Sequence, residues 1–112
     1  MLNDFGGLTV RVQTAGAYPI EDAIVRVRGA QEGNSEIIFS LVTDNDGLTE
    51  KIRLPTPSPE LSKYPDSRED PYSLYDVEIV ADGYAPKNLY GLTVFPGIDS
   101  LQIVGLIPEQ IE

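Results

Sequence analysis

Short segments in which apolar and polar residues alternate constrain this chain more than any other feature of its sequence. Residues 8–13 (LTVRVQ), 23–28 (AIVRVR) and 75–80 (YDVEIV) show this period-two pattern. Successive side chains of a strand point to opposite faces, so each segment predicts a β-strand with one buried face. No segment combines a sustained helical period with helix caps. We therefore expect an all-β chain.

Turn-forming residues separate these segments at short intervals. Glycine, proline, asparagine and aspartate gather at 16–19, 32–34, 44–47, 82–83 and 96–99, and each favours turn conformations. Further strands are expected at 36–43, 48–54, 87–95 and 101–107. Residues 36–43 (EIIFSLVT) are apolar on both faces, which predicts a strand that is central in its sheet or covered on both sides. Seven short strands indicate an antiparallel sandwich or barrel.

The segment 55–71 interrupts the strands with prolines at positions 55, 57, 59, 65 and 71. Proline fixes its φ angle and lacks an N–H donor, so this segment cannot be a central strand. We expect a long Pro-rich loop, 55–71, within a single domain, 1–112. A linker between two domains is the alternative, but the stretches on either side are short and strand-poor for independent folding.

The composition excludes several kinds of chemistry. The chain has no cysteine and no histidine, which rules out disulfides, thiolate nucleophiles and the usual metal ligands. Its net charge of −10 disfavours nucleic acids and anionic membrane surfaces. No apolar run is long enough to span a bilayer, and residues 1–7 lack the basic and apolar regions of a signal peptide, so we do not expect them to act as one. We expect that the chain is not an enzyme and that it binds no cofactor and no metal.

Acidic residues at the turns are the candidates for a calcium site. Asp44, Asp46 and Asp82 could supply oxygen ligands, but their spacing does not match an EF-hand loop. Solvated turns are therefore the favoured interpretation. In the Pro-rich loop, the acids Asp66, Glu69 and Asp70 are expected to hydrate the loop.

Aromatic residues near loops and strand ends are the candidate ligand or partner surface. This set comprises Tyr64, Tyr72, Tyr90 and Phe95. Tyrosine combines a rigid apolar ring with a polar tip, so it stacks on sugars and is common at protein interfaces. Tyr75 and Phe39 are instead expected to fill the core.

Basic residues in two of the expected strands suggest protection of sheet edges. Charged side chains discourage an open edge from pairing with another strand. Arg26, Arg28, Lys51 and Arg53 are candidates for this role, or for a small basic patch on an acidic protein.

Three motifs occur in an order that resembles carboxypeptidase-regulatory-like (prealbumin-like) domains. They are 19–25 (PIEDAIV), 43–47 (TDNDG) and 81–86 (ADGYAP). In that family, the motif at 19–25 enters the second strand. The motif at 43–47 is a turn that links two hairpin strands, and the motif at 81–86 precedes the next strand. The resemblance implies a seven-stranded antiparallel Greek-key β-sandwich.

The second half of the chain is also similar to the N-terminal domain of clostridial peptidoglycan-binding and spore-cortex-lytic proteins. The similarity lies in 71–77 (PYSLYDV), 83–86 (GYAP), 94–97 (VFPG) and 106–108 (LIP). It implies a non-catalytic accessory module at the cell wall or spore, with a structural or adaptor role. Its partner would be another protein or an adjoining wall-binding or lytic domain. The alternative is a carbohydrate-binding module that stacks loop tyrosines on peptidoglycan or another glycan.

Overall fold

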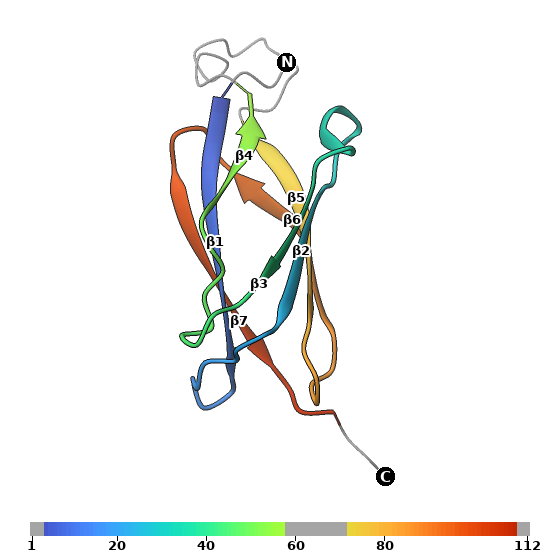
Figure 1. Ribbon diagram of the computed structural model, residues 1–112. Coiled ribbons are helices and arrows are strands. Elements are labelled where there is room, and N and C mark those ends of the chain that lie inside the picture. Colours follow the sequence, from blue (N-terminus) through green and yellow to red (C-terminus); the bar gives the residue numbers. More distant parts are fainter. Residues whose placement is uncertain (1–3, 58–71, 110–112) are drawn as a thin grey trace.

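The computed structural model describes residues 4–57 and 72–109, which form two packed β-sheets (Figure 1). The strands are β1 (Asp4–Thr14), β2 (Ile24–Gly29), β3 (Ile38–Val42), β4 (Ile52–Thr56), β5 (Ser73–Val80), β6 (Lys87–Val94) and β7 (Asp99–Leu106), with a short 3₁₀ helix η1 (Glu32–Asn34). One sheet has the order β4-β1-β7, and the other has the order β3-β2-β5-β6. The predicted all-β, seven-stranded sandwich is confirmed. The described residues contain no helix with the length and apolar character needed to cross a bilayer.

The core lies between the sheets and is built from every second residue of the strands. The fully buried side chains include Leu8, Val10, Val12, Val25, Val27, Leu54, Tyr75, Val77, Ile79 and Leu106. These are the positions that the alternating segments place on one face. Removal of this apolar surface from water is the main stabilising contribution to such a fold.

The first and last strands pair in parallel. Gly7–Thr14 of β1 lies beside Asp99–Leu106 of β7 in a continuous register, whereas the other four strand pairings are antiparallel. Alternation predicts which residues form a strand, but it carries no information on which strands become neighbours. The sandwich is therefore mixed at this one pairing.

The expectation that residues 36–43 form a central or doubly covered strand is wrong. β3 is an edge strand of the four-stranded sheet, and Ile38 and Val42 are 59% and 57% exposed on its outer face. Leu41 is buried, and Phe39 is half-buried against the core. The apolar residues on the outer face of β3 are therefore exposed, and no described element covers them.

The fourth strand and the start of the Pro-rich segment also differ from expectation. β4 begins at Ile52 and contains Pro55, while Leu48 makes only an isolated bridge to Arg11. A proline is tolerated there because β4 is an edge strand, where one side needs no ladder donor. Residues 58–71 lie outside the described part of the chain, so the loop interpretation for them and the domain limits of 1–112 stay predictions.

Candidate functional site: recognition surfaces of the sandwich

The outer face of the four-stranded sheet carries ordered rows of side chains. Strand register places three rows across β3, β2 and β5: Val42–Ile24–Val80, Ser40–Arg26–Glu78 and Ile38–Arg28–Asp76. The members of the first row are all apolar and at least 39% exposed. Exposed apolar side chains that lie together are typical of contact surfaces.

A β-bulge in β6 shapes one corner of this face. Between Leu89 and Leu92, β6 has one residue more than the facing segment of β5. Gly91 adopts a φ of 67°, and its N–H donates to Oδ1 of Asp76 at 2.9 Å. The extra residue allows Leu89 and Leu92 both to pack against the core, and it leaves Tyr90 77% exposed. Bulges commonly redirect a side chain in this way.

Tyr90 borders a shallow hollow of about 260 Å³. The hollow is lined by Arg26, Arg28, Asp76, Val77, Glu78, Asn88 and Tyr90. An exposed ion pair crosses it, with Arg26 Nη1 3.6 Å from Glu78 Oε1, and water screens such pairs strongly. The hollow offers hydrogen-bond donors, acceptors and one aromatic ring, which suits reversible contact.

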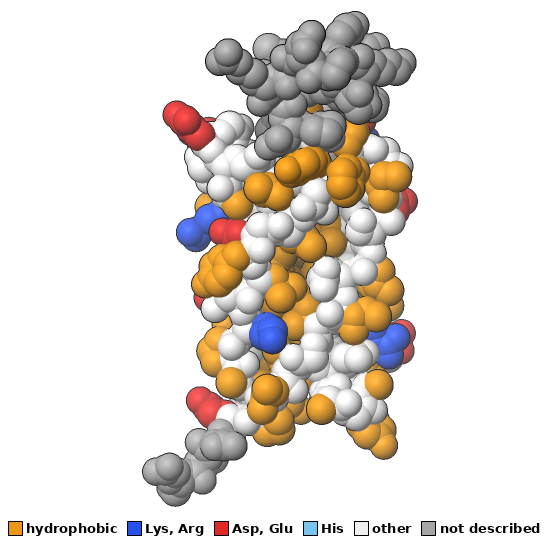
Figure 2. Space-filling view, turned by 180° about the vertical axis from the view of Figure 1, so that it is seen from behind, with side chains coloured by type: hydrophobic (Ala, Val, Ile, Leu, Met, Phe, Trp, Pro, Cys, Tyr) orange, Lys and Arg blue, Asp and Glu red, His pale blue; other side chains and the backbone are white. Residues whose placement is uncertain are grey.

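A second aromatic group lies at the end of the sandwich where β1 begins and β4 ends. The rings of Tyr72 and Phe95 meet edge to face, with centroids 5.7 Å apart and an interplanar angle of 64°. The guanidinium of Arg53 lies 4.6 Å from the centroid of Phe5, a cation–π arrangement. Hydrophobic side chains gather at the upper end of the described part of the molecule in Figure 2.

The structure brings together only two of the four aromatic residues predicted as a ligand or partner surface. Tyr72 and Phe95 are in contact, but Tyr90 lies on the outer face of the four-stranded sheet. Tyr64 lies outside the described residues. Tyr75, expected in the core, is fully buried.

Sequence reasoning missed a band of exposed apolar residues along β7. It consists of Ile98, Leu101, Ile103 and Ile107, which are 52%, 55%, 52% and 67% exposed; we call it the β7 band. Leu101 and Ile103 lie beside Thr9 and Arg11 of β1. Alternation in 101–107 shows two faces, but only the sheet order reveals that this outer face is uncovered by the described residues.

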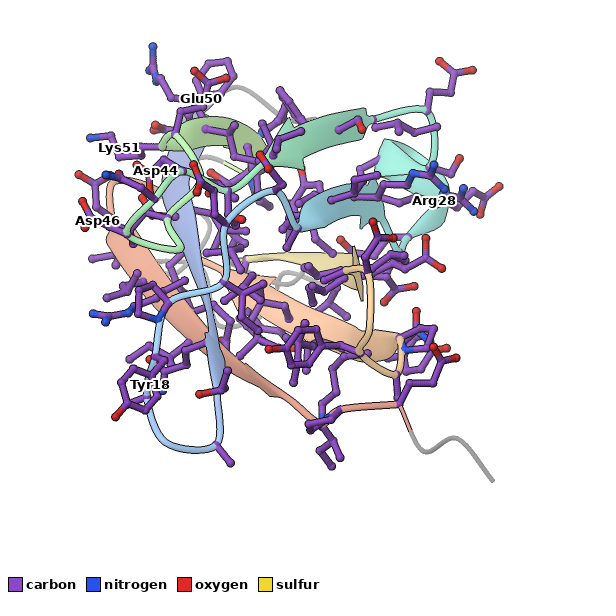
Figure 3. The ribbon with its side chains drawn as sticks, turned by 60° about the horizontal axis from the view of Figure 1, so that its bottom comes forward. Tyr18, Arg28, Asp44, Asp46, Glu50 and Lys51 are labelled. Carbon is purple, nitrogen blue, oxygen red and sulfur yellow. The ribbon has the colours of Figure 1, made fainter. Side chains whose placement is uncertain are left out.

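The edge-protection prediction is wrong for Arg26 and Arg28, and for Arg53 it stays a prediction. Arg53 lies in the edge strand β4, whereas β2 is internal to its sheet. Lys51 precedes β4, and its Nζ lies 3.1 Å from Oδ2 of Asp99. Arg28 and Lys51 lie on opposite sides of the sandwich (Figure 3), so the four basic residues do not form one patch.

The acidic turn residues act as turn formers. Oδ1 of Asp44 accepts the N–H groups of Asp46 at 2.9 Å and Leu48 at 3.0 Å, which confirms the turn interpretation for Asp44. Among residues 4–57 and 72–109, no three acidic side chains are grouped as a metal ion would require. Asp66, Glu69 and Asp70 lie outside the described residues.

One buried tyrosine joins the two sheets. The hydroxyl of Tyr75, in β5, donates to the carbonyl oxygen of Pro55, in β4, at 2.7 Å. Burial raises the pKa of the Tyr75 phenol from 10.0 to about 12, although a hydrogen bond with Asn34 acts in the lowering direction. The phenol therefore stays neutral near pH 7 and serves as a structural hydrogen-bond donor.

Comparison with known proteins identifies the fold and no family. No protein-family model and no curated protein sequence matches this chain. Among solved structures, the TIE protein of Bacillus anthracis matches with a TM-score of 0.61 and 14% identity, over 92% of this chain and 16% of that protein. The 3-chlorocatechol 1,2-dioxygenase of Rhodococcus opacus 1CP has a TM-score of 0.61 and 13% identity, over 92% of this chain and 60% of that enzyme.

The major pilin subunit of Bacillus cereus is also similar, with a TM-score of 0.55 and 12% identity, over 94% of this chain and 29% of the pilin. This chain thus spans less than two thirds of each of these three proteins. At such low identities the similarities show a shared β-sandwich fold, and one fold hosts many unrelated functions.

Proposed function

We propose that this chain is a non-catalytic accessory module with a structural or adaptor role in a cell-wall- or spore-associated protein, and that it acts through protein–protein contacts. The observation that carries this proposal is the β7 band, whose four residues are each more than half exposed. A band of this kind on a small acidic protein is costly in water and is typical of a surface that another protein covers.

Three of the described acidic side chains have structural contacts, which supports a non-catalytic role for them. Asp44 caps its turn, Asp76 holds the bulge, and Asp99 pairs with Lys51. Carboxylates committed to backbone or ion-pair contacts are poorly placed to act as general acids or bases. The similarity to a dioxygenase is a similarity of fold and carries no activity to this chain.

The assignment to a cell wall or spore depends on the family resemblance of the motifs. Residues 19–25 lead into β2, and residues 81–86 lead into β6, as the resemblance implies. Residues 43–47 link β3 to β4, which belong to different sheets, so the expectation that this turn joins two hairpin strands is wrong. The positions of the other two motifs are what supports the proposal.

Site-specific photo-crosslinking in the source organism tests the proposal. A photoreactive residue at position 103 is expected to crosslink the native full-length protein to another protein or to an adjoining domain. The same probe at Ile38, which is 59% exposed against 52% for Ile103, is the matched control. Crosslinks equal at both positions, or to glycan alone, would contradict protein contact through the β7 band. Turnover of a wall substrate by the isolated chain would contradict the non-catalytic role.

A carbohydrate-binding module is the second candidate, because Tyr90 places an exposed ring beside polar groups of the hollow. Aromatic faces and planar hydrogen-bonding groups together suit sugar rings. Titration with soluble peptidoglycan fragments tests it, with Tyr90→Ala as the variant. Tyr18→Ala is the control, because Tyr18 is similarly exposed at 72%. Saturable binding that only Tyr90→Ala removes would favour this alternative.

A further inference from the structure

The four edge strands of the sandwich differ in how they are protected. Edges expose unpaired N–H and C=O groups, which natural proteins guard with proline, charge, bulges or short strands. β4 contains Pro55 and Arg53. β6 begins with Lys87 and carries the bulge, and β3 has only five residues.

β7 is the least protected of these edges in the described part of the chain, since its one charged residue is Asp99 at its first position. It has eight residues, no proline, and no charged residue after Asp99. It pairs with β1 without a register shift. Its second edge therefore presents a regular, uncharged row of backbone groups, bordered on the outer face by the apolar side chains of Leu101 and Ile103.

β6 of the other sheet runs along the same side of the sandwich as β7. Residues 95–98 join the end of β6 to the start of β7. At the opposite end, the N–H of Ala85 donates to the carbonyl of Ile107 and the N–H of Glu109 to that of Gly83, both at 2.9 Å. The half-buried side chains of β6, Leu89 and Leu92, pack on the core along this side.

We propose that the open edge of β7 binds an extended, cationic segment of a partner protein, which adds a fourth strand to the three-stranded sheet. This proposal rests on the proposed function and specifies the chemistry of its partner. Backbone hydrogen bonds to β7 provide the attachment, and alternate side chains provide selectivity. One face of the added strand covers Leu101 and Ile103, and the other covers the side of the core near Leu89 and Leu92.

Charge selects a cationic partner over a second copy of this chain. The chain has a net charge of −10, and its described residues from 88 to 109 contain two acids, Asp99 and Glu109, and no lysine or arginine. Two copies joined edge to edge would bring these acidic segments together, and like charges across an interface are strongly disfavoured. A segment with lysine or arginine beside its apolar residues is attracted instead.

Synthetic peptides test this proposal with the whole chain. The probe alternates valine and threonine between terminal lysines and matches the eight residues of β7; the same peptide with terminal glutamates is the charge control. We expect the lysine peptide to shift the amide NMR signals of β7 and to slow their hydrogen exchange. We expect the glutamate peptide to bind at least tenfold more weakly.

Two matched variants locate the contact. Ile103→Lys places a cation at the edge, and is expected to weaken binding of the lysine peptide at least tenfold. Ile38→Lys, at an equally exposed position of β3, is expected to leave binding unchanged. Far-UV circular dichroism and thermal unfolding verify that both variants fold.

Several outcomes would overturn the inference. These are no peptide binding, equal binding of both peptides, protection at another edge, or a concentration-dependent dimer that Ile103→Lys dissolves. If the peptides do not bind but position 103 crosslinks to a protein, the proposed adaptor role is still supported. If the peptides do not bind and position 103 gives no protein crosslinks, both proposals are refuted.

Discussion

Tyr75→Phe is the most informative single change, because it removes one hydroxyl and leaves the buried ring in place. The lost hydrogen bond joins β5 to Pro55 of β4 at 2.7 Å. A hydrogen bond of this kind contributes about 0.5–1.5 kcal/mol, and an unpaired buried carbonyl adds to the loss. We expect the variant to be about 1–2 kcal/mol less stable than the wild type at pH 7.

The same variant makes a prediction about alkaline pH. The Tyr75 phenol has a pKa of about 12 in the folded protein against its ordinary value of 10.0, so the folded state holds its proton more tightly than the unfolded state. The resulting stability is complete below about pH 10, and is lost as the pH rises from 10 towards 12. A difference of two pKa units corresponds to roughly 2–3 kcal/mol.

Urea unfolding of both proteins between pH 7 and pH 12 measures this effect. Because the two proteins share every other side chain, the difference in unfolding free energy between wild type and variant isolates Tyr75. We expect the wild-type advantage to shrink above pH 10 and to vanish or reverse near pH 12. A difference that stays constant across this range would refute the argument that burial governs the Tyr75 phenol.

Three further changes test other contacts. Thr43→Val should cost about 2–3 kcal/mol in urea unfolding, because the Thr43 hydroxyl accepts from Ala23 N at 2.9 Å and donates to Ile20 O at 2.7 Å; Thr43→Ser should be much milder. Gly47→Ala should lower the melting temperature more than Gly83→Ala. Both glycines have positive φ, but only at Gly47 would an added Cβ meet the backbone, 2.4 Å from Val12 O. Equal decreases in melting temperature would contradict this. Glu78→Gln should change stability by less than about 1 kcal/mol, because its ion pair with Arg26 is exposed; a larger loss in urea unfolding would show that the pair is not screened.

Much of the fold can be predicted from alternation, because burial enforces it. The predicted segments 8–13 and 75–80 lie within β1 and β5, and segment 23–28 begins one residue before β2. Edge positions are harder, since an apolar outer face such as that of β3 imitates the pattern of a covered strand. The bulge is harder still: Leu89 and Leu92 break the alternation, and only their contact with β5 explains why both face the core.

The candidate surfaces could be predicted less well. Aromatic chemistry marked candidate residues from the sequence, but the contact between Tyr72 and Phe95 depends on how distant strands meet. The β7 band cannot be predicted without the sheet order, because the sequence does not show that β7 is an edge strand. Leu101 and Ile103 lie beside an open edge only because β7 has that position. The local alternation of residues identifies the two faces of each strand, whereas the arrangement of the strands and sheets decides which faces stay exposed.

The parallel alignment of β1 and β7 has a mechanical consequence. The beginning of β1 and the end of β7 lie at opposite ends of the sandwich (Figure 1). Tension between those two points runs along the strand axes and loads the eight-residue pairing in shear. Sheared hydrogen bonds must yield together, whereas an antiparallel terminal hairpin would be peeled apart one bond at a time. Traction along this module is therefore resisted by the whole pairing of its first and last strands at once.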